Sequence, residues 1–323
     1  MATRYWTGET DTDFEVVTNW SDDTMPVDGD TIYFDGRAED DSTTGNKVSC
    51  LLNLDRAPAA GVNFAAIYIQ EDFTGDIGDG LGILDTDDAP DTGTALQCTA
   101  DKIIIRGTGT YYFNCFDFDE TDNMDLVIMD SSGGTAIFGK GYHATAAKGR
   151  KVTKLINVKG TFDLRGATGT GTGDFQASEI DEIFNITSYA STNIRSGGTS
   201  TTLDIYHADG TVYMDSKFVS YTLADGTAIL GNEGDFPAAT VVGTLLTMYG
   251  GAVTWRILST LTTLTIYNGT ITATGSQAKI LTNSSLYGGK LDLQTAQTGD
   301  ITVSNAPVIT GLDAEYLPPK DDI

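Results

Sequence analysis

The sequence predicts an all-β chain, a right-handed parallel β-helix (β-solenoid) with a small N-terminal cap. Three observations support this fold class. Threonine makes up roughly one residue in seven, and its branched side chain favours strands. Glycine, at 37 residues, supplies the positive-φ turns that many short strands need. Finally, short apolar runs recur along the chain between Gly, Asp and Asn turns, while amphipathic helical periodicity is nearly absent.

The recurrence begins near residue 100. Short strand-like runs then return at irregular intervals, several of them roughly 16 to 29 residues, close to the range of repeat architectures. They occupy residues 103–107, 126–130, 155–164, 203–206, 211–214, 227–230, 264–271 and 286–293. A single coil cannot bury its own inner side chains, whereas stacked coils share a continuous core. The runs therefore predict parallel strands stacked from coil to coil.

An antiparallel β-sandwich built from hairpins is the alternative. Asp-Gly and Asn-Gly pairs, such as Asp209-Gly210 and Asn268-Gly269, are strong hairpin signals. We favour the solenoid because the apolar runs resemble one another, as stacking demands, and because their spacing varies by loop-sized amounts. The hairpin alternative stays open at this point.

Domain boundaries follow from where the repeats begin and end. Residues 1–65 hold two of the three tryptophans and no clear repeat, so they are expected to cap the open end and to form an attachment region. Residues 66–312 form the predicted β-solenoid. Residues 313–323 contain Pro318-Pro319, which cannot donate strand hydrogen bonds, and are expected to be an exposed C-terminal tail.

The core of the solenoid is expected to hold one apolar residue from each run. The candidate inward residues are Ile104, Ile128, Ile156, Ile205, Ile229, Leu264 and Leu293.

The charge balance narrows the possible partners. Asp and Glu number 45 against 19 Lys and Arg, a net charge of −26. This charge repels nucleic acids and anionic membrane surfaces, so neither is an expected partner. Cys50, Cys98 and Cys115 are too few and odd in number for a disulfide framework. No secretory signal or membrane span is apparent, so synthesis in the cytoplasm is expected.

Few residues are candidates for metal binding or catalysis. Asp117, Asp119 and Asp122 stand in an acidic cluster that could supply oxygen ligands to calcium, although a solvated loop is the favoured explanation of the cluster. His143 and His207 stand in no pattern typical of a catalytic triad or a zinc site. Carboxylate pairs for glycoside hydrolysis would arise by chance in so acidic a chain. We therefore expect no enzymatic activity and no cofactor other than calcium.

The opening of the chain carries an ordered set of motifs. They are Tyr5-Trp6-Thr7-Gly8, Asn19-Trp20-Ser21, Pro26 and Gly29-Asp30-Thr31-Ile32-Tyr33-Phe34, followed by residues 66–69 and 73–78. This order resembles the start of a family of phage virion structural proteins, and also the repeat openings of some bacterial surface β-helix proteins. The resemblance implies a virion component, a capsid decoration or fibre-like protein. The motif residues Trp6, Trp20, Pro26, Gly29 and Asp30 are expected to build the cap.

The expected function is therefore structural. The chain is predicted to be a homotrimeric capsid decoration (cement) or fibre-like protein on the virion surface. Its other expected partner is the major capsid protein or another virion protein, contacted through the cap. A receptor-binding or glycan-degrading tailspike and a bacterial surface adhesin are the alternatives. Aromatic residues of the later repeats could form the trimer interface, or stack within one chain: Tyr206, Tyr213, Tyr249, Trp255, Tyr267 and Tyr287.

Overall fold

The structure of the chain is a computed structural model. It describes residues 1–36, 48–52, 54, 63–80, 95–115, 124–140, 152–165, 180–195, 203–214, 217–231, 242–256, 260–274, 278–294 and 301–319. The chain forms two compact units, Met1–Ile180 (unit 1) and Asp181–Ile323 (unit 2). Within the described residues the fold is nearly all β, as the sequence predicts.

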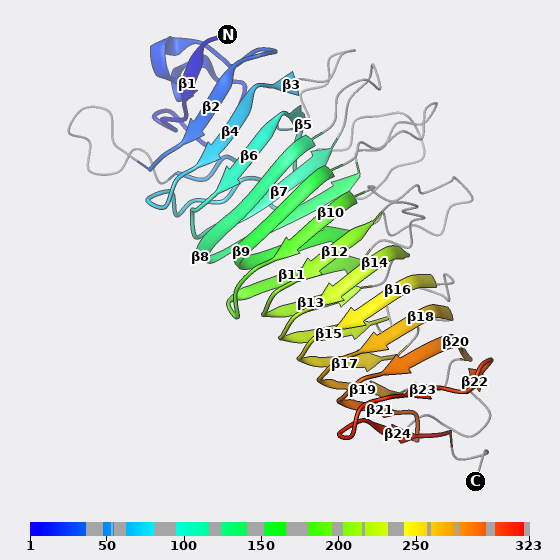
Figure 1. Ribbon diagram of the computed structural model, residues 1–323. Coiled ribbons are helices and arrows are strands. Elements are labelled where there is room, and N and C mark those ends of the chain that lie inside the picture. The colour runs from blue at the N-terminus through cyan, green and yellow to red at the C-terminus, as the bar shows by residue number, and fades with distance from the viewer. Residues whose placement is uncertain are drawn as a thin grey trace, which may run out of the picture. The chain divides into compact units, whose positions relative to one another are not determined.

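Unit 1 combines a cap with parallel strands (Figure 1). Two 3-10 turns, η1 (Val17–Asn19) and η2 (Ser21–Asp23), belong to the cap. The strands are β1 (Thr3–Tyr5), β2 (Thr31–Phe34), β3 (Asn63–Phe64), β4 (Ala66–Ile69), β5 (Leu96–Ala100), β6 (Lys102–Ile105), β7 (Thr110–Cys115), β8 (Met124–Lys140) and β9 (Val152–Arg165). One ladder runs through β1, β2, β4, β6, β8 and β9, always in parallel register.

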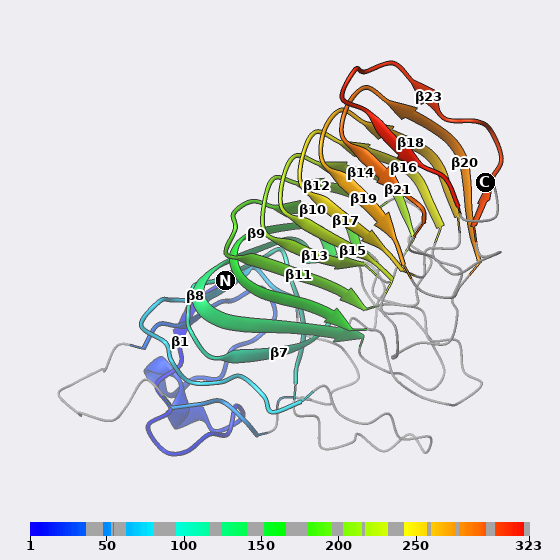
Figure 2. The ribbon, with the colours of Figure 1, turned by 90° about the horizontal axis from the view of Figure 1, so that it is seen from below.

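Unit 2 repeats a simpler coil of two short strands (Figure 2). The strands are β10 (Ile180–Asn185), β11 (Ala190–Arg195), β12 (Asp204–His207), β13 (Thr211–Met214), β14 (Phe218–Leu223), β15 (Thr227–Leu230), β16 (Val242–Met248), β17 (Ala252–Trp255), β18 (Thr260–Ile266), β19 (Thr270–Ala273), β20 (Lys279–Leu286), β21 (Lys290–Asp292), β22 (Ile301–Val303), β23 (Val308–Ile309) and β24 (Glu315–Leu317).

The pairing pattern in unit 2 is that of a parallel β-solenoid. From β10 to β20, each strand pairs with the strand two places further along, so that β12 pairs with β14 and β13 pairs with β15, both in parallel. Every ladder between the described strands of unit 2 is parallel. The hairpin alternative is therefore wrong. The Asp-Gly and Asn-Gly turns join the two strands of one coil, and each strand finds its hydrogen-bond partners in the neighbouring coils.

Glycine makes the turn possible within the coils of unit 2 from β12 to β21. Gly226 has φ +88°, and a Cβ built on it would lie 2.5 Å from the carbonyl oxygen of Gly210 in the preceding coil. A Cβ built on Gly251 would likewise lie 2.5 Å from the carbonyl oxygen of Gly226. The carbonyl of Gly210 accepts a hydrogen bond from the Thr227 amide at 2.8 Å. Only glycine combines this positive φ with so close a backbone approach.

The core prediction is confirmed in part. Ile205, Leu264 and Leu293 are buried, at 3%, 0% and 1% exposure. Four other candidates are wrong, because Ile104, Ile128, Ile156 and Ile229 alternate with the inward residues and lie on the outer side of their strands. The inward residues around them include Ile103 and Ile105, Val127 and Met129, Leu155, Ala228 and Leu230. Runs that are apolar on both faces gave no signal of which face is inside.

Strand pairing extends beyond both predicted boundaries of the solenoid. The parallel ladder starts inside residues 1–65, since β1 pairs with β2, and β2 pairs with β4. At the other end, β24 pairs with β21, so the expectation of an exposed tail fails as far as Leu317. Pro319 is also buried. The two prolines follow the last strand and therefore take no hydrogen bond away from it.

Candidate functional site

The motif residues of the cap meet in one aromatic cluster. Trp6 and Trp20 are buried and pack edge to face, with ring centroids 5.2 Å apart. Phe14 packs against Trp20 at 4.9 Å, and Phe34 lies within 6.0 Å of both indoles. The indole N–H of Trp6 donates to the Val48 carbonyl at 2.9 Å, and that of Trp20 donates to the Phe14 carbonyl at 2.8 Å. Burial with satisfied N–H groups is what a structural cap requires.

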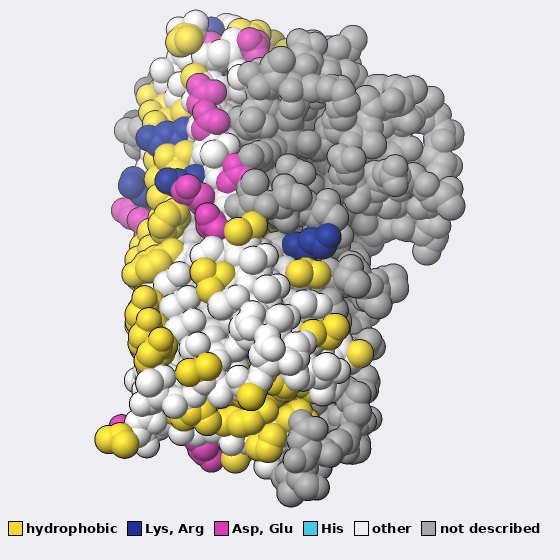
Figure 3. Space-filling view, turned by 45° about the vertical axis from the view of Figure 1, so that its right-hand side comes forward, with side chains coloured by type: hydrophobic (Ala, Val, Ile, Leu, Met, Phe, Trp, Pro, Cys, Tyr) yellow, Lys and Arg dark blue, Asp and Glu magenta, His cyan; other side chains and the backbone are white. Residues whose placement is uncertain are grey.

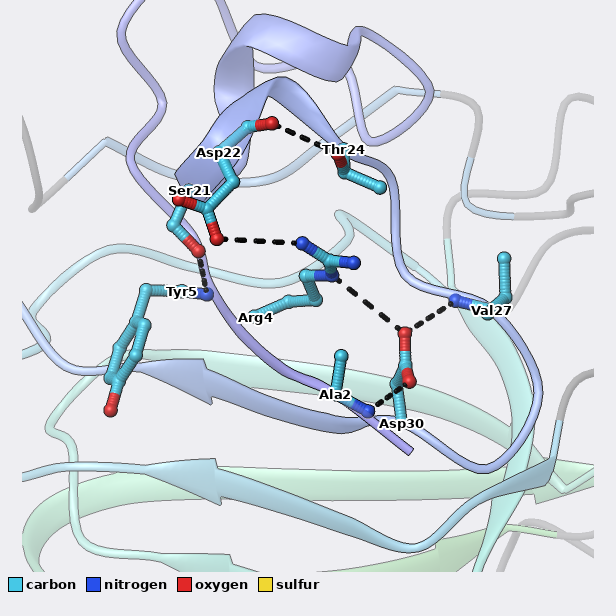
Figure 4. A network of polar contacts seen from close by, with 8 residues as sticks. All are labelled: Ala2, Arg4, Tyr5, Ser21, Asp22, Thr24, Val27 and Asp30. Carbon is cyan, nitrogen blue, oxygen red and sulfur yellow. Dashed lines mark hydrogen bonds and ion pairs between the residues drawn. The ribbon is translucent and has the colours of Figure 1, made fainter.

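Asp30 ties the N-terminal strand to the rest of the cap (Figure 4). Its carboxylate accepts the backbone N–H of Ala2 at 2.6 Å and that of Val27 at 3.2 Å. The Arg4 Nε lies 3.8 Å from the same carboxylate. Gly29, directly before Asp30, turns the chain at φ +77°, and Pro26 is buried beside this turn. The sequence motif thus corresponds to a turn whose carboxylate binds two backbone amides.

Arg4 extends this network toward the surface. Its guanidinium lies 3.6 Å from Asp22, whose side chain is 81% exposed. Asp22 and Asp23 both adopt positive φ, at 60° and 47°, which is uncommon for residues other than glycine. The hydroxyl of Ser21 accepts the Tyr5 N–H at 3.0 Å. These contacts hold β1 and η2 together, and the carboxylate of Asp30 is occupied by donors of the chain itself.

Three of the predicted interface tyrosines form a regular row in unit 2. Tyr249, Tyr267 and Tyr287 directly follow β16, β18 and β20 and stack with ring centroids 5.0 and 4.9 Å apart. The rings are nearly parallel, at interplanar angles of 2° and 11°. Their exposures are 55%, 45% and 48%. The tyrosine row therefore stacks within the chain and also presents aromatic edges and hydroxyls to solvent.

The remaining aromatic candidates lie apart from the tyrosine row. Tyr206 and Tyr213 are exposed on β12 and β13, the two different strands of one coil. The prediction of Trp255 as an interface residue is wrong, because Trp255 is buried in the core at 1% exposure and cannot belong to an outer interface. Its register neighbours in the stack are Leu230 and the small Ala273. A small neighbour in the next coil leaves room for the indole inside.

Unit 2 contains a buried polar pair that was not predicted from the sequence. His207 and Tyr221 are both 0% exposed, and the His207 Nδ1 lies 2.9 Å from the Tyr221 hydroxyl. Burial lowers the pKa of His207 from 6.5 to about 4, against smaller opposing effects of backbone hydrogen bonds at Gly210 and Asp209 and of the Asp209 and Asp225 charges. Burial also raises the pKa of Tyr221. The alternation from Leu203 through Ile205 was the available signal that His207 points inward.

The calcium candidates Asp117, Asp119 and Asp122 lie outside the described residues. Within the described ranges, no group of three or more His, Cys, Asp or Glu side chains is placed to hold a metal. Cys50 and Cys98 are buried, and burial raises the pKa of the Cys50 thiol, so its reactive thiolate is disfavoured. In the part of the chain that the structure describes, no helix is long and apolar enough to cross a membrane.

Comparisons with protein-family models, with curated proteins and with solved structures found no match to this chain.

Proposed function

We propose that the chain is a structural protein of a bacteriophage virion, a trimeric capsid decoration or fibre-like protein at the virion surface. The observation that carries the proposal is the burial of the residues of the opening motif. Trp6, Trp20, Pro26 and Asp30, which carry the resemblance to phage structural proteins, are all buried within the cap of unit 1. A motif used in this way builds a stable end for a solenoid, which is an architectural role.

The polar interior supports the same proposal. Buried polar groups hold turns and strands by hydrogen bonds: Asn185 donates to the Asp209 carbonyl at 2.6 Å, and Thr192 donates to Asn185 at 2.8 Å. The buried His207 contacts Tyr221 in the core. A net charge of −26 favours solubility and discourages non-specific association. These features suit a rigid body that carries no reaction, and enzymatic activity is not part of the proposal.

The test is mass spectrometry of purified particles from the phage that encodes the chain. We expect its peptides in virions that have passed a density gradient, at a level comparable with other structural proteins. Peptides found only in the lysate, and absent from the particles, would refute a virion component.

A receptor-binding spike is the second candidate, and the tyrosine row favours it. Tyr249, Tyr267 and Tyr287 present aromatic edges and hydroxyl groups at a regular spacing, and exposed aromatic residues are enriched at binding surfaces. A glycan array combined with a reducing-sugar assay would separate the candidates. Binding that is lost in Tyr267→Ala would support the spike, while silence in both assays would leave the structural proposal.

A further inference from the structure

The turn between β18 and β19 contains the one Asn-Gly pair of the sequence, Asn268-Gly269. The backbone N–H of Gly269 donates to the side-chain oxygen of Asn268 at 2.8 Å. Asn268 is exposed, and Gly269 turns the chain at φ +94°. A side-chain amide and the backbone nitrogen that follows it therefore lie in contact at the surface of unit 2.

The chain on both sides of this pair is fixed to the preceding coil. The backbone amides of Tyr267 and Thr270 donate to carbonyl groups of that coil at 2.8 and 3.0 Å. The Gly269 N–H lies between these two contacts and is directed to the side chain of Asn268. The stack therefore holds the backbone nitrogen beside the side-chain amide, and rotation of the Asn268 side chain brings its Cγ to that nitrogen. Such positioning favours a reaction within the turn.

The neighbouring coils leave Asn268 uncovered. The strand registers place Gly250 of the preceding coil and Gly288 of the following coil opposite Asn268. Neither glycine has a side chain that could shield the amide, so the exposed side chain of Asn268 is open to water.

The outer surface beside this turn is weakly charged. The outward row that ends at the turns holds uncharged residues in continuous register, Thr222, Thr247, Thr265 and Ser285. Figure 3 shows few acidic or basic side chains on the described surface in the lower half of the view, where the strands of unit 2 lie. A new carboxylate at this turn would therefore alter the local charge measurably.

Aspartate occupies the same position in two other turns of unit 2. Asp209 and Asp225 precede Gly210 and Gly226, and their side-chain oxygens accept the glycine N–H at 2.7 and 2.8 Å. Both glycines have φ +88°, close to the +94° in the Asn268 turn. The turn therefore accommodates aspartate, the side chain that hydrolysis of the amide would leave, with the same hydrogen bond.

We propose that Asn268 is a modification site, at which the folded protein deamidates without an enzyme. The Gly269 nitrogen loses its proton to hydroxide and attacks Cγ of Asn268, so that an N–Cγ bond forms and the Cγ–Nδ2 bond breaks. The leaving nitrogen takes a proton from water and departs as ammonia. A water molecule then opens the succinimide at one of its two carbonyl carbons, which leaves aspartate or isoaspartate. The reaction needs no partner and is independent of the proposed function.

The test is incubation of the purified full-length protein at 37 °C, at pH 7 and at pH 9, with circular dichroism to verify the fold. Digestion at low pH followed by peptide mass spectrometry measures deamidation at each asparagine. We expect Asn268 to react, and to react faster at pH 9, because the Gly269 nitrogen must lose a proton. An acidic species that elutes with the Asn268→Asp variant in anion exchange should accumulate in parallel. An intact Asn268 after several weeks at pH 9 would overturn the proposal.

A sequence-matched control separates the geometry of the turn from the dipeptide itself. Ser284→Gly creates a second Asn-Gly pair at Asn283, which is exposed but lies inside β20, where pairing with β18 restrains the backbone. We expect Asn283 of this folded variant to deamidate at least about tenfold more slowly than Asn268. Equal rates at the two asparagines would overturn the role of the turn.

A second variant tests the same geometry by gain of a site, and it remains informative if Ser284→Gly fails to fold. Asp225→Asn makes an Asn-Gly pair at an exposed, equivalent turn, where the side-chain oxygen lies 2.8 Å from the Gly226 nitrogen. Its deamidation rate should lie within about fivefold of that of Asn268, since the reacting groups are placed alike. A variant that keeps its new asparagine while Asn268 reacts would contradict the turn as the determinant.

Discussion

The Nδ1 of His207 lies 2.9 Å from the hydroxyl oxygen of Tyr221, with both side chains inside the core of unit 2. The two residues belong to successive coils, on the paired strands β12 and β14. This contact couples a titratable group to the packing of the stack, and it gives unit 2 a dependence on pH.

We expect unit 2 to lose stability as the pH falls below 6.5. The pKa of His207 is about 4 in the folded chain and 6.5 when unfolded, so the unfolded state binds the proton first. Stability is therefore complete above pH 6.5 and declines toward pH 4, by about 2–3 kcal/mol at pH 4.5. Urea unfolding at pH 7.5 and 4.5 measures the change.

The control for this prediction is His207→Leu, since Leu223 fills the next position of the same inward row. Acidic side chains titrate equally in both proteins, so the difference between the two pH slopes isolates the histidine. Equal slopes in the wild type and His207→Leu would contradict a buried neutral imidazole.

A pair of aspartate substitutions tests which side of each strand faces the core. Ile266→Asp should unfold unit 2, because Ile266 is 0% exposed and an unpaired buried charge costs several kcal/mol against a typical total of about 5–15. Ile156→Asp should leave the chain folded, because Ile156 lies on the outer side of β9. Circular dichroism and thermal unfolding compare the two. A folded Ile266→Asp, or an unfolded Ile156→Asp, would reverse the assignment.

The glycine turns of unit 2 should tolerate no side chain. In Gly226→Ala the new Cβ would lie 2.5 Å from the Gly210 carbonyl oxygen, at a φ of +88°. We expect a loss of more than about 2 kcal/mol, since left-handed backbone alone costs about 1–2 kcal/mol outside glycine. Gly133→Ala is the control, because nothing lies within 4 Å of its Cβ position. Guanidinium unfolding should show little change in Gly133→Ala, and an equal effect of both substitutions would count against the close coil-to-coil approach.

Trp255 and Tyr287 should differ sharply when truncated. Trp255→Ala empties a core position at 1% exposure and should cost about 3–5 kcal/mol. Tyr287→Ala removes a side chain that is 48% exposed at the end of the tyrosine row and should cost about 1 kcal/mol or less. Denaturant titration of both variants decides whether Trp255 belongs to the core. A small effect of Trp255→Ala would restore it as a candidate for an outer surface.

The parallel stacked architecture could be predicted from the sequence. Which face of each strand lies in the core could be predicted only poorly. Recurring runs and Gly turns predicted the parallel stack, because stacking demands similarity between coils. In residues 103–105 the chain reads Ile-Ile-Ile, so alternation could not say that Ile104 faces outward. Trp255 was misplaced because its space inside depends on Ala273 in the next coil, a relationship that only the register reveals. The inward orientation of His207 could have been predicted from alternation alone, since Leu203 and Ile205 precede it at intervals of two.

The copy number of the chain on intact particles tests the central claim most directly. Quantitative mass spectrometry against the major capsid protein, with isotope-labelled peptides of both, gives the number of chains per virion. A structural trimer predicts a fixed number divisible by three that is unchanged by high-salt washing of the particles. A trace amount that varies between preparations, or its removal by washing, would contradict a structural role in the virion.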